Sequence, residues 1–424
     1  MMDELKSRVK QVEDGKLNGN DVYSASIRKT ADGLVFAYRR PKEDFLIATG
    51  VLSSELVGER FEVDGKPCVA APFNHESAGF LRTHFPFTAP TAVLKKNKTI
   101  GLGDRLGIAS PGHIEAVLDD DVYPILAQQS IRELKQTNRT YEDVLDDATF
   151  AVFCAGFERG FGADGDHLKT PEEVNYALET GFTMITLDCS EYIRNDVQNL
   201  SDIEVGEICS LPDSVYTRYI GRSYEIQDGI LISLDEVTLK RAYLIYGAAI
   251  EFASSIYSEY ILKSQREIDF EISIDETLTP TLPEHHFFVA NELNQKQIDV
   301  ATIAPRFCGD FQKGIDYIGD VARFEKELKI HAAIAKHFGY KLSIHSGSDK
   351  FSIFRMIGEH TNGCFHLKTA GTSWLEAMRL VAMKDAGLYR EIHHFALKKF
   401  SEAAKLYKVK AELNRIPDVD LLSD

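Results

Sequence analysis

Short apolar segments alternate with helical segments from Lys98 onward, and this alternation constrains the fold more than any other feature of the sequence. Strands that are separated by helices pair in parallel through crossover connections. We predict seven such strands, over residues 99–102, 150–155, 183–188, 269–275, 299–304, 341–345 and 364–368. The fold class is therefore α/β, either a TIM-type (β/α) barrel whose eighth strand is not recognised or an open doubly wound sheet. Polar residues follow nearly every strand, which favours the barrel, because an open sheet collects them at one switch point.

The first 95 residues differ from the remainder and are predicted to be rich in β-structure. Two Asp-Gly pairs, at Asp32 and Asp64, lie between segments of mixed or alternating polarity, which is the pattern of short hairpins. Pro86 and Pro90 then interrupt any helix or central strand. We therefore place an N-terminal β-rich domain at residues 1–95 and a barrel catalytic domain at residues 96–424. The N-terminal domain would cover the barrel or mediate subunit contact in a homo-oligomer.

The charge and the cysteine spacing argue against several classes of protein. The formal net charge of -17 disfavours a nucleic-acid partner, because phosphate binding needs dense basic patches. The six cysteines show no CxxC spacing, which predicts reduced thiols rather than a disulfide framework or a thiolate zinc cage. No apolar run approaches the roughly 18 residues that span a bilayer, and the first residues do not resemble a signal peptide. We expect a cytoplasmic protein with no membrane partner.

The segment from residue 150 to residue 170 holds the densest group of polar residues after a predicted strand. We interpret residues 150–155 as a buried strand and Thr170 as the N-cap of a helix that begins at Pro171. The carboxyl end of a strand is where ligands bind in α/β folds. The loop between strand and helix would carry four candidate site residues: Asp164, Asp166, His167 and Lys169.

The same loop matches the GxGxxG fingerprint of dinucleotide-binding folds, at Gly160, Gly162 and Gly165. In those folds the helix begins within the glycine run, so that its free N–H groups meet the pyrophosphate. Here five residues separate Gly165 from Pro171, and the nearby acidic side chains would repel phosphate. We therefore interpret the glycines as space for a tight turn.

Later strands add further ionisable side chains. Glu271 lies inside an apolar strand, where it either faces solvent or is functional, because a buried carboxylate must be paired or bound. Asp275 and Glu276 could cap the following turn. A lone histidine at a strand end is more often structural than a ligand, but His167 and His345 follow different parallel strands. With an oxygen ligand and an open position, they would form a divalent-metal site for zinc, nickel or manganese.

Several basic residues at strand ends could hold the carboxylate of an anionic substrate, or could be solvated surface charges. The last predicted strand also presents His366. The basic residues are Lys169, Arg306, Lys350 and Lys368. By contrast, His285–His286 and His393–His394 lie in helical contexts and are interpreted as ordinary helix residues.

Several segments, taken together, resemble the tagaturonate epimerase family over most of the chain. They are Thr83–Phe87, Gly101–Gly107 with Ser110–His113, Gly162–Thr170, Ala304–Phe307 with Gln312–Gly319, and Ile344–Lys350. The resemblance implies a metal-dependent isomerase of bacterial hexuronate breakdown on a barrel-type fold. Such an enzyme would interconvert the ketohexuronates D-tagaturonate and D-fructuronate by inverting carbon 4.

The resemblance also implies roles for individual residues. The implied metal ligands are His167, Gln312 and His345, the implied proton acceptor is Asp164, and the implied proton donor is Glu271. Two of these roles have alternatives. Asp166 could replace Asp164 as the base, and Asp310 is chemically a better metal ligand than Gln312, whose neutral amide binds metal less strongly.

The chemistry of this reaction leaves two routes. The hydrogen on carbon 4 is not adjacent to the carbonyl at carbon 2, so its removal as a proton would leave an unstabilised carbanion. One route breaks the bond between carbons 3 and 4 in a retro-aldol step, and the other oxidises carbon 4 transiently with a nicotinamide cofactor. The first needs a Lewis acid, a base and an acid, which the strand-end residues could supply. We expect the retro-aldol route; a metal-dependent sugar aldolase or ketose isomerase on the same barrel is the alternative function.

Overall fold

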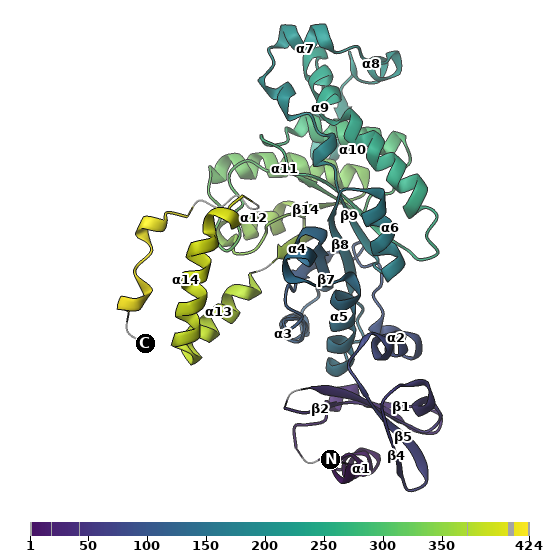
Figure 1. Ribbon diagram of the computed structural model, residues 1–424. Helices are drawn as coiled ribbons and strands as arrows, with labels where there is room; N and C mark the ends of the chain where they lie inside the picture. Colours follow the sequence, from purple (N-terminus) through teal and green to yellow (C-terminus); the bar gives the residue numbers. More distant parts are fainter. Residues whose placement is uncertain (1, 18, 42, 371, 406–410, 423–424) are drawn as a thin grey trace. The chain divides into compact units, whose positions relative to one another are not determined.

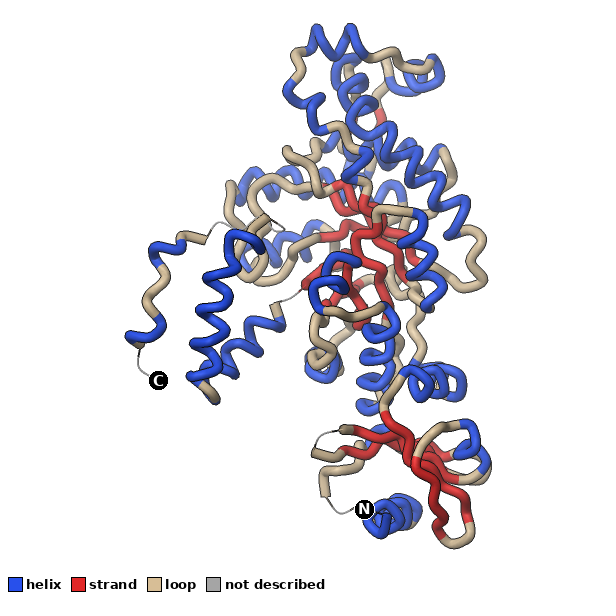
Figure 2. Tube along the Cα trace, in the orientation of Figure 1, coloured by secondary structure: helices blue, strands red, loops and turns tan. Residues whose placement is uncertain are grey.

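A computed structural model describes the chain except for residues 1, 18, 42, 371, 406–410 and 423–424, and Figures 1 and 2 show the described elements. The chain divides into two compact units. The first unit is Met1–Thr186 with Tyr260–Asp269, and the second is Leu187–Glu259 with Phe270–Asp424. The domain boundary at residue 95 stays a prediction. Among the described residues, no helix combines the length and the apolar character that a membrane crossing requires.

The predicted (β/α) barrel is confirmed. Within the described part of the chain, eight strands form a closed barrel in which neighbours along the chain are also neighbours in the barrel. The pairs whose register is resolved are parallel. The strands are β6 (Lys98–Gly103), β7 (Tyr123–Ser130), β8 (Gly162–Leu168), β9 (Met184–Asp188), β12 (Asp269–Ile274), β13 (Thr302–Pro305), β14 (Lys341–Ile344) and β15 (Phe365–Ala370).

Helices connect or follow these strands, as the alternation predicted. In the first unit they are α3 (Ser110–Val117), α4 (Ile131–Thr137), α5 (Tyr141–Ala155) and α6 (Pro171–Thr180). In the second unit they are α7 (Asp202–Ile208), α8 (Asp213–Tyr219), α9 (Glu236–Ile256), α10 (Pro283–Gln295), α11 (Val321–Phe338), α12 (Phe351–His360), α13 (Ser373–Lys384) and α14 (Ala386–Ala403). The helix expected after Thr170 is confirmed, since the Thr170 side chain accepts a hydrogen bond from the N–H of Glu173.

The N-terminal region forms the expected antiparallel sheet, with strand order β1-β2-β3-β5-β4. Asp64 and Gly65 both have positive φ, of 50° and 79°, and form the two-residue turn between β4 and β5. Helices α1 (Met2–Glu13) and α2 (His75–His84) pack into separate apolar clusters that each include sheet residues. The strands are β1 (Arg28–Lys29), β2 (Leu34–Arg39), β3 (Asp44–Thr49), β4 (Glu59–Val63) and β5 (Lys66–Pro72), and a separate pair is formed by β10 (Tyr224–Glu225) and β11 (Leu231–Ile232).

The strand predicted at residues 150–155 is wrong, because these residues form the end of helix α5. The helix begins at a capping box, in which the side chains of Thr140 and Asp143 each accept a hydrogen bond from the other residue's backbone N–H. It ends at Gly156, whose φ is 60°. Its aromatic side chains Phe150 and Phe153 pack in the apolar cluster that includes β2, β3 and β5. A run of buried aromatic residues on a helix therefore resembled a buried strand.

The loop predicted for residues 156–169 is also wrong over most of its length. Strand β8 begins at Gly162, so Asp164, Asp166 and His167 lie on a barrel strand and not after one. Two of the fingerprint glycines, Gly162 and Gly165, thus lie inside the strand. A Cβ on Gly162 would lie 3.0 Å from Cγ1 of Ile125. Close packing, rather than a tight turn or a phosphate loop, accounts for the glycine at 162.

Candidate active site

Glu271 on β12 is the centre of a buried polar cluster in the second unit, and it does not face solvent. Its Oε1 atom lies 2.8 Å from Nε2 of His345 and 3.3 Å from Nζ of Lys368. Thr302 Oγ1 donates a hydrogen bond of 2.5 Å to Oε2. Burial raises the pKa of the Glu271 carboxyl, but the charges of Lys368 and His345 outweigh burial and hold the pKa well below its usual range. Glu271 is therefore ionised at neutral pH.

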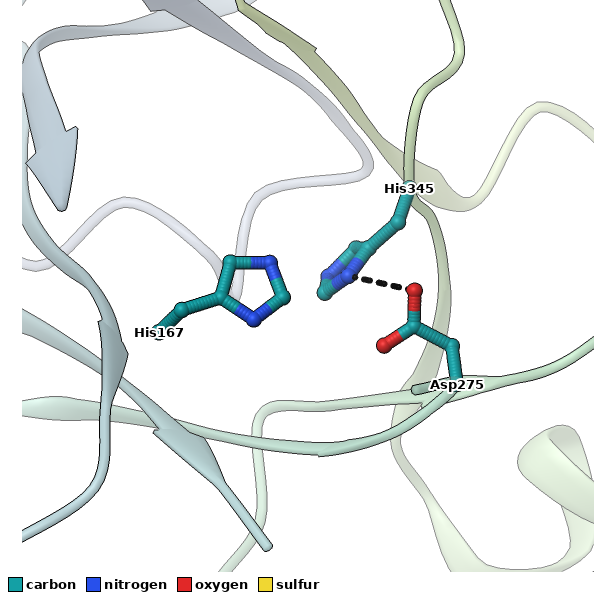
Figure 3. Close-up of side chains that lie close together, drawn as sticks. All are labelled: His167, Asp275 and His345. Atoms are coloured by element: carbon teal, nitrogen blue, oxygen red, sulfur yellow. Dashed lines mark hydrogen bonds and ion pairs between the residues drawn. The ribbon is translucent and has the colours of Figure 1, made fainter. Parts of the chain in front are cut away.

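His345 follows β14 and lies between two carboxylates. Its Nδ1 atom is 3.1 Å from Oδ2 of Asp275, as the dashed line in Figure 3 marks, and its Nε2 atom faces Glu271. Burial lowers the pKa of His345, but Asp275 and Glu271 outweigh it and raise the pKa to about 10. Carboxylates that favour a proton on this imidazole would also favour a metal cation in the proton's place.

Asp275 was not among the predicted site residues, because it could simply cap the following turn. Its carboxylate accepts a hydrogen bond of 2.5 Å from Ser273 Oγ as well as contacting His345. The signal in the sequence was the position of an acidic residue directly after a buried strand. Within the second unit, Asp275 and His345 each offer an atom that could bind a metal ion.

A cavity of about 280 Å³ lies where β12, β13 and β14 end, and His345 and Asp275 are in its wall. Gln312 and Asp310, the two alternative oxygen ligands, both line this cavity, and so does Arg306. Its volume is near the lower end of the range of small-molecule sites. The cavity is further lined by Glu276, Thr277, Pro305, Phe307, Gly309, Phe311 and Ser346.

Lys350 is buried and holds the loop that carries Gln312. Its ammonium donates to the main-chain carbonyls of Gln312, Ile315 and Ser348, at 2.8, 2.7 and 2.7 Å. Burial lowers the pKa of Lys350. Because an ammonium has three N–H donors, these three carbonyls use all of them. A substrate-binding role for Lys350 stays a prediction, but its visible role is to fix the loop.

The other basic residues predicted for the substrate differ in their surroundings. Lys368 on β15 is directed at the Glu271 carboxylate. His366 on the same strand is buried, and burial lowers its pKa to about 3, so the imidazole is neutral at physiological pH. Lys169 directly follows β8, and its backbone N–H donates to Glu173.

In the first unit, β8 presents the remaining predicted residues. Asp164 is buried, and its Oδ1 accepts a hydrogen bond of 2.9 Å from Thr186 Oγ1. His167 Nε2 lies 3.8 Å from Oδ1 of Asp166. The backbone of His167 has φ of 54°, a left-handed conformation that residues other than glycine rarely adopt and that clusters at functional sites. Asp164 and Asp166 both stay candidates for the base.

Comparison with known proteins agrees with the resemblance of the sequence motifs. The family model of tagaturonate epimerase matches residues 23–424. The tagaturonate/fructuronate epimerase of Thermotoga maritima is 40% identical over 413 residues, which are 96% of this chain and 85% of that protein. A glycerol complex of the fructuronate-tagaturonate epimerase of Cohnella laeviribosi is 48% identical, with a TM-score of 0.92 over 99% of this chain and 86% of that chain. The native structure of the same Cohnella protein gives the same identity and TM-score over 98% and 85% of the two chains. The chain therefore belongs to the tagaturonate epimerase family and is an enzyme of the isomerase class.

Proposed function

We propose that this enzyme interconverts D-tagaturonate and D-fructuronate by inverting carbon 4, with the help of a divalent metal ion. The observation that supports this pair of substrates is the family match over residues 23–424. The buried cluster of Glu271, His345 and Lys368 supports catalysis, because perturbed ionisable groups beside a cavity are typical of active sites.

Asp275 and His345 would hold the metal, and the resemblance to the family adds His167 as a further ligand. Imidazole nitrogen and carboxylate oxygen are suitable donors for zinc, nickel or manganese. The two carboxylates beside His345 supply negative charge that would stabilise a cation there. Gln312 and Asp310 share a cavity with His345 and are each candidates for a further oxygen ligand. When bound, the metal would serve as a Lewis acid toward substrate oxygens.

The protein's own carboxylates would move the protons. In the retro-aldol route the hydroxyl at carbon 4 loses its proton as the bond between carbons 3 and 4 breaks. The resulting aldehyde rotates so that its opposite face meets carbon 3 before the bond is remade, and the oxygen on carbon 4 then regains a proton. Asp164 or Asp166 would accept the proton, and Glu271 would donate one.

The pKa of Glu271 constrains this scheme. Because the pKa lies well below its usual range, Glu271 can donate a proton only after it has accepted one in the same turnover. The ammonium of Lys368, at 3.3 Å, favours the ionised carboxylate and is too weak an acid to protonate it, so the proton that Glu271 returns would be the one released by the hydroxyl at carbon 4. Lys368 would thus hold Glu271 ionised between turnovers rather than bind the substrate, and no group would be left changed after a turnover.

Product identification tests the proposed substrate and reaction. The protein is incubated with D-tagaturonate and divalent metal, and the products are identified by NMR. We expect D-fructuronate as the product. Three-carbon fragments would instead indicate an aldolase, an aldose would indicate a ketose isomerase, and either result would overturn the proposal.

A substrate that carries deuterium at carbon 4 separates the two chemical routes. The retro-aldol route leaves the bond between carbon 4 and its hydrogen intact, so we expect no primary isotope effect on turnover. Transient oxidation breaks that bond in both directions. A primary isotope effect would therefore contradict the retro-aldol route without affecting the identity of the substrate.

A further inference from the structure

We propose that Arg306 binds the carboxylate of the substrate and thereby selects sugar acids over neutral ketoses. Arg306 directly follows β13 and lines the cavity that also contains His345 and Asp275. This inference rests on the proposed function for the identity of the sugar. It adds the residue that recognises the feature distinguishing a ketohexuronate from a ketohexose.

The charge of the cavity wall requires such a residue. Three carboxylates line the cavity, those of Asp275, Glu276 and Asp310. Among the described residues that line it, Arg306 is the one lysine or arginine, and both ring nitrogens of His345, the other basic residue in the wall, already contact the carboxylates of Asp275 and Glu271. An anionic substrate that entered beside three carboxylates would be repelled unless a cation received its charge.

The backbone of Arg306 is fixed while its side chain is available. The N–H of Thr281 donates to the carbonyl of Arg306 at 2.8 Å, and the N–H of Arg306 donates to Oγ1 of the buried Thr281 at 3.1 Å. Arg306 is half-buried as a residue, and its guanidinium makes no hydrogen bond or ion pair with the described residues. The side chain is thus anchored at the cavity with its five donors open to a ligand.

The other cations of the second unit that were predicted to bind substrate already have protein partners. The ammonium of Lys350 donates to three carbonyls, and that of Lys368 contacts Glu271. The guanidinium of Arg306 also has the better shape, because its planar fork can donate two parallel hydrogen bonds to one carboxylate.

Calorimetry with a sugar acid and a neutral sugar tests this assignment directly. Binding of D-tagaturonate and D-tagatose is measured for the wild-type protein as purified and for the variants Arg306→Met, Arg306→Lys and Arg355→Met. Arg355 is a matched control, because it lies on the exposed surface of α12 and pairs there with Glu359. We expect Arg306→Met to lose about tenfold to a hundredfold in affinity for tagaturonate with little change for tagatose. Arg306→Lys should lose less, and Arg355→Met should bind as the wild type does.

Two outcomes would overturn the proposal. One is an Arg306→Met protein that keeps the wild-type preference for tagaturonate, and the other is an equal loss of affinity for both sugars. If Arg306→Met does not fold, as judged by circular dichroism, Arg306→Lys decides, since it retains the stem and the charge and loses the fork. The uronate is first brought to its tagaturonate–fructuronate equilibrium, so that turnover contributes no heat, and product identification with the wild type still decides the proposed reaction separately.

Discussion

Two buried histidine clusters in the second unit show how neighbours decide what a histidine can do. In the first, His345 lies between the carboxylates of Glu271 and Asp275, and its pKa is raised to about 10. In the second, Nδ1 of His286 on α10 lies 2.9 Å from Nδ1 of His331 on α11, and Tyr340 contacts His286 at 2.7 Å. Burial lowers the pKa of His331 to about 4 and that of His286 well below its usual range.

The first environment favours a positive charge on the imidazole, and the second favours neutral rings. Both clusters are buried, so burial alone does not explain the difference. Carboxylates surround His345 and favour positive charge, whereas the partners of His286 are a second imidazole and a phenol, which favour neutral rings. We therefore expect changes in the first cluster to affect catalysis and changes in the second to affect stability.

The largest effect is expected from His345→Ala. Loss of an imidazole from the proposed metal site should lower kcat by about a thousandfold and reduce the bound metal measured by elemental analysis. His337→Ala, at an exposed position on α11, is the matched control and should keep both. Full activity of His345→Ala would remove the distinction between the two clusters.

A stability effect of comparable size is expected from His286→Ala. The change opens a cavity and leaves His331 and Tyr340 without their shared partner, so the free energy of unfolding should fall by about 3 kcal/mol or more. Urea unfolding measures this loss. The kcat of the folded variant should stay close to that of the wild type, and a large fall in kcat with unchanged stability would contradict the structural role.

The second cluster should also make stability depend on pH. The pKa of His331 is about 4 in the folded protein and about 6.5 when unfolded, so the unfolded state binds a proton first as the pH falls. The stability contributed by neutral His331 is present above pH 6.5 and is lost between pH 6.5 and 4. Compared with the wild type, His331→Asn should lose less stability over this range, by up to about 3 kcal/mol in urea unfolding. Equal losses would show that His331 is not held neutral.

The smallest effect is expected from Ser273→Ala, which removes the hydroxyl that orients Asp275. Without this hydrogen bond the carboxylate can turn away from His345, so kcat/KM should fall by about threefold to tenfold. The free energy of unfolding should change little. A fall in stability without a change in kcat/KM would mean that Ser273 belongs functionally with the second cluster.

The alternation of strands and helices was sufficient to predict the barrel, but not every strand in it. Strand β8 escaped recognition because Asp164, Asp166 and His167 interrupt its apolar character. Such residues are tolerated inside a barrel when they are hydrogen-bonded, as Asp164 is to Thr186. Hydrophobic periodicity cannot reveal a partner that comes from a different strand.

The site was predictable in kind but not in detail. The sequence indicated that His345 and Glu271 should have partners, because an ionisable residue in or after a buried strand needs one. It could not show that these two residues contact each other, or that the ammonium of Lys350 donates hydrogen bonds to three main-chain carbonyls. Those facts depend on how separate strands and loops pack together.

The most direct test of the account is metal removal and return. The protein is stripped with a chelator, and epimerisation of D-tagaturonate is then measured after separate addition of zinc, nickel, manganese or NAD, in the wild type and in His345→Ala. We predict that wild-type activity disappears, returns with at least one of the metals but not with NAD, and is not restored in His345→Ala. Activity that survives complete removal of metal, or returns with NAD alone, would contradict it.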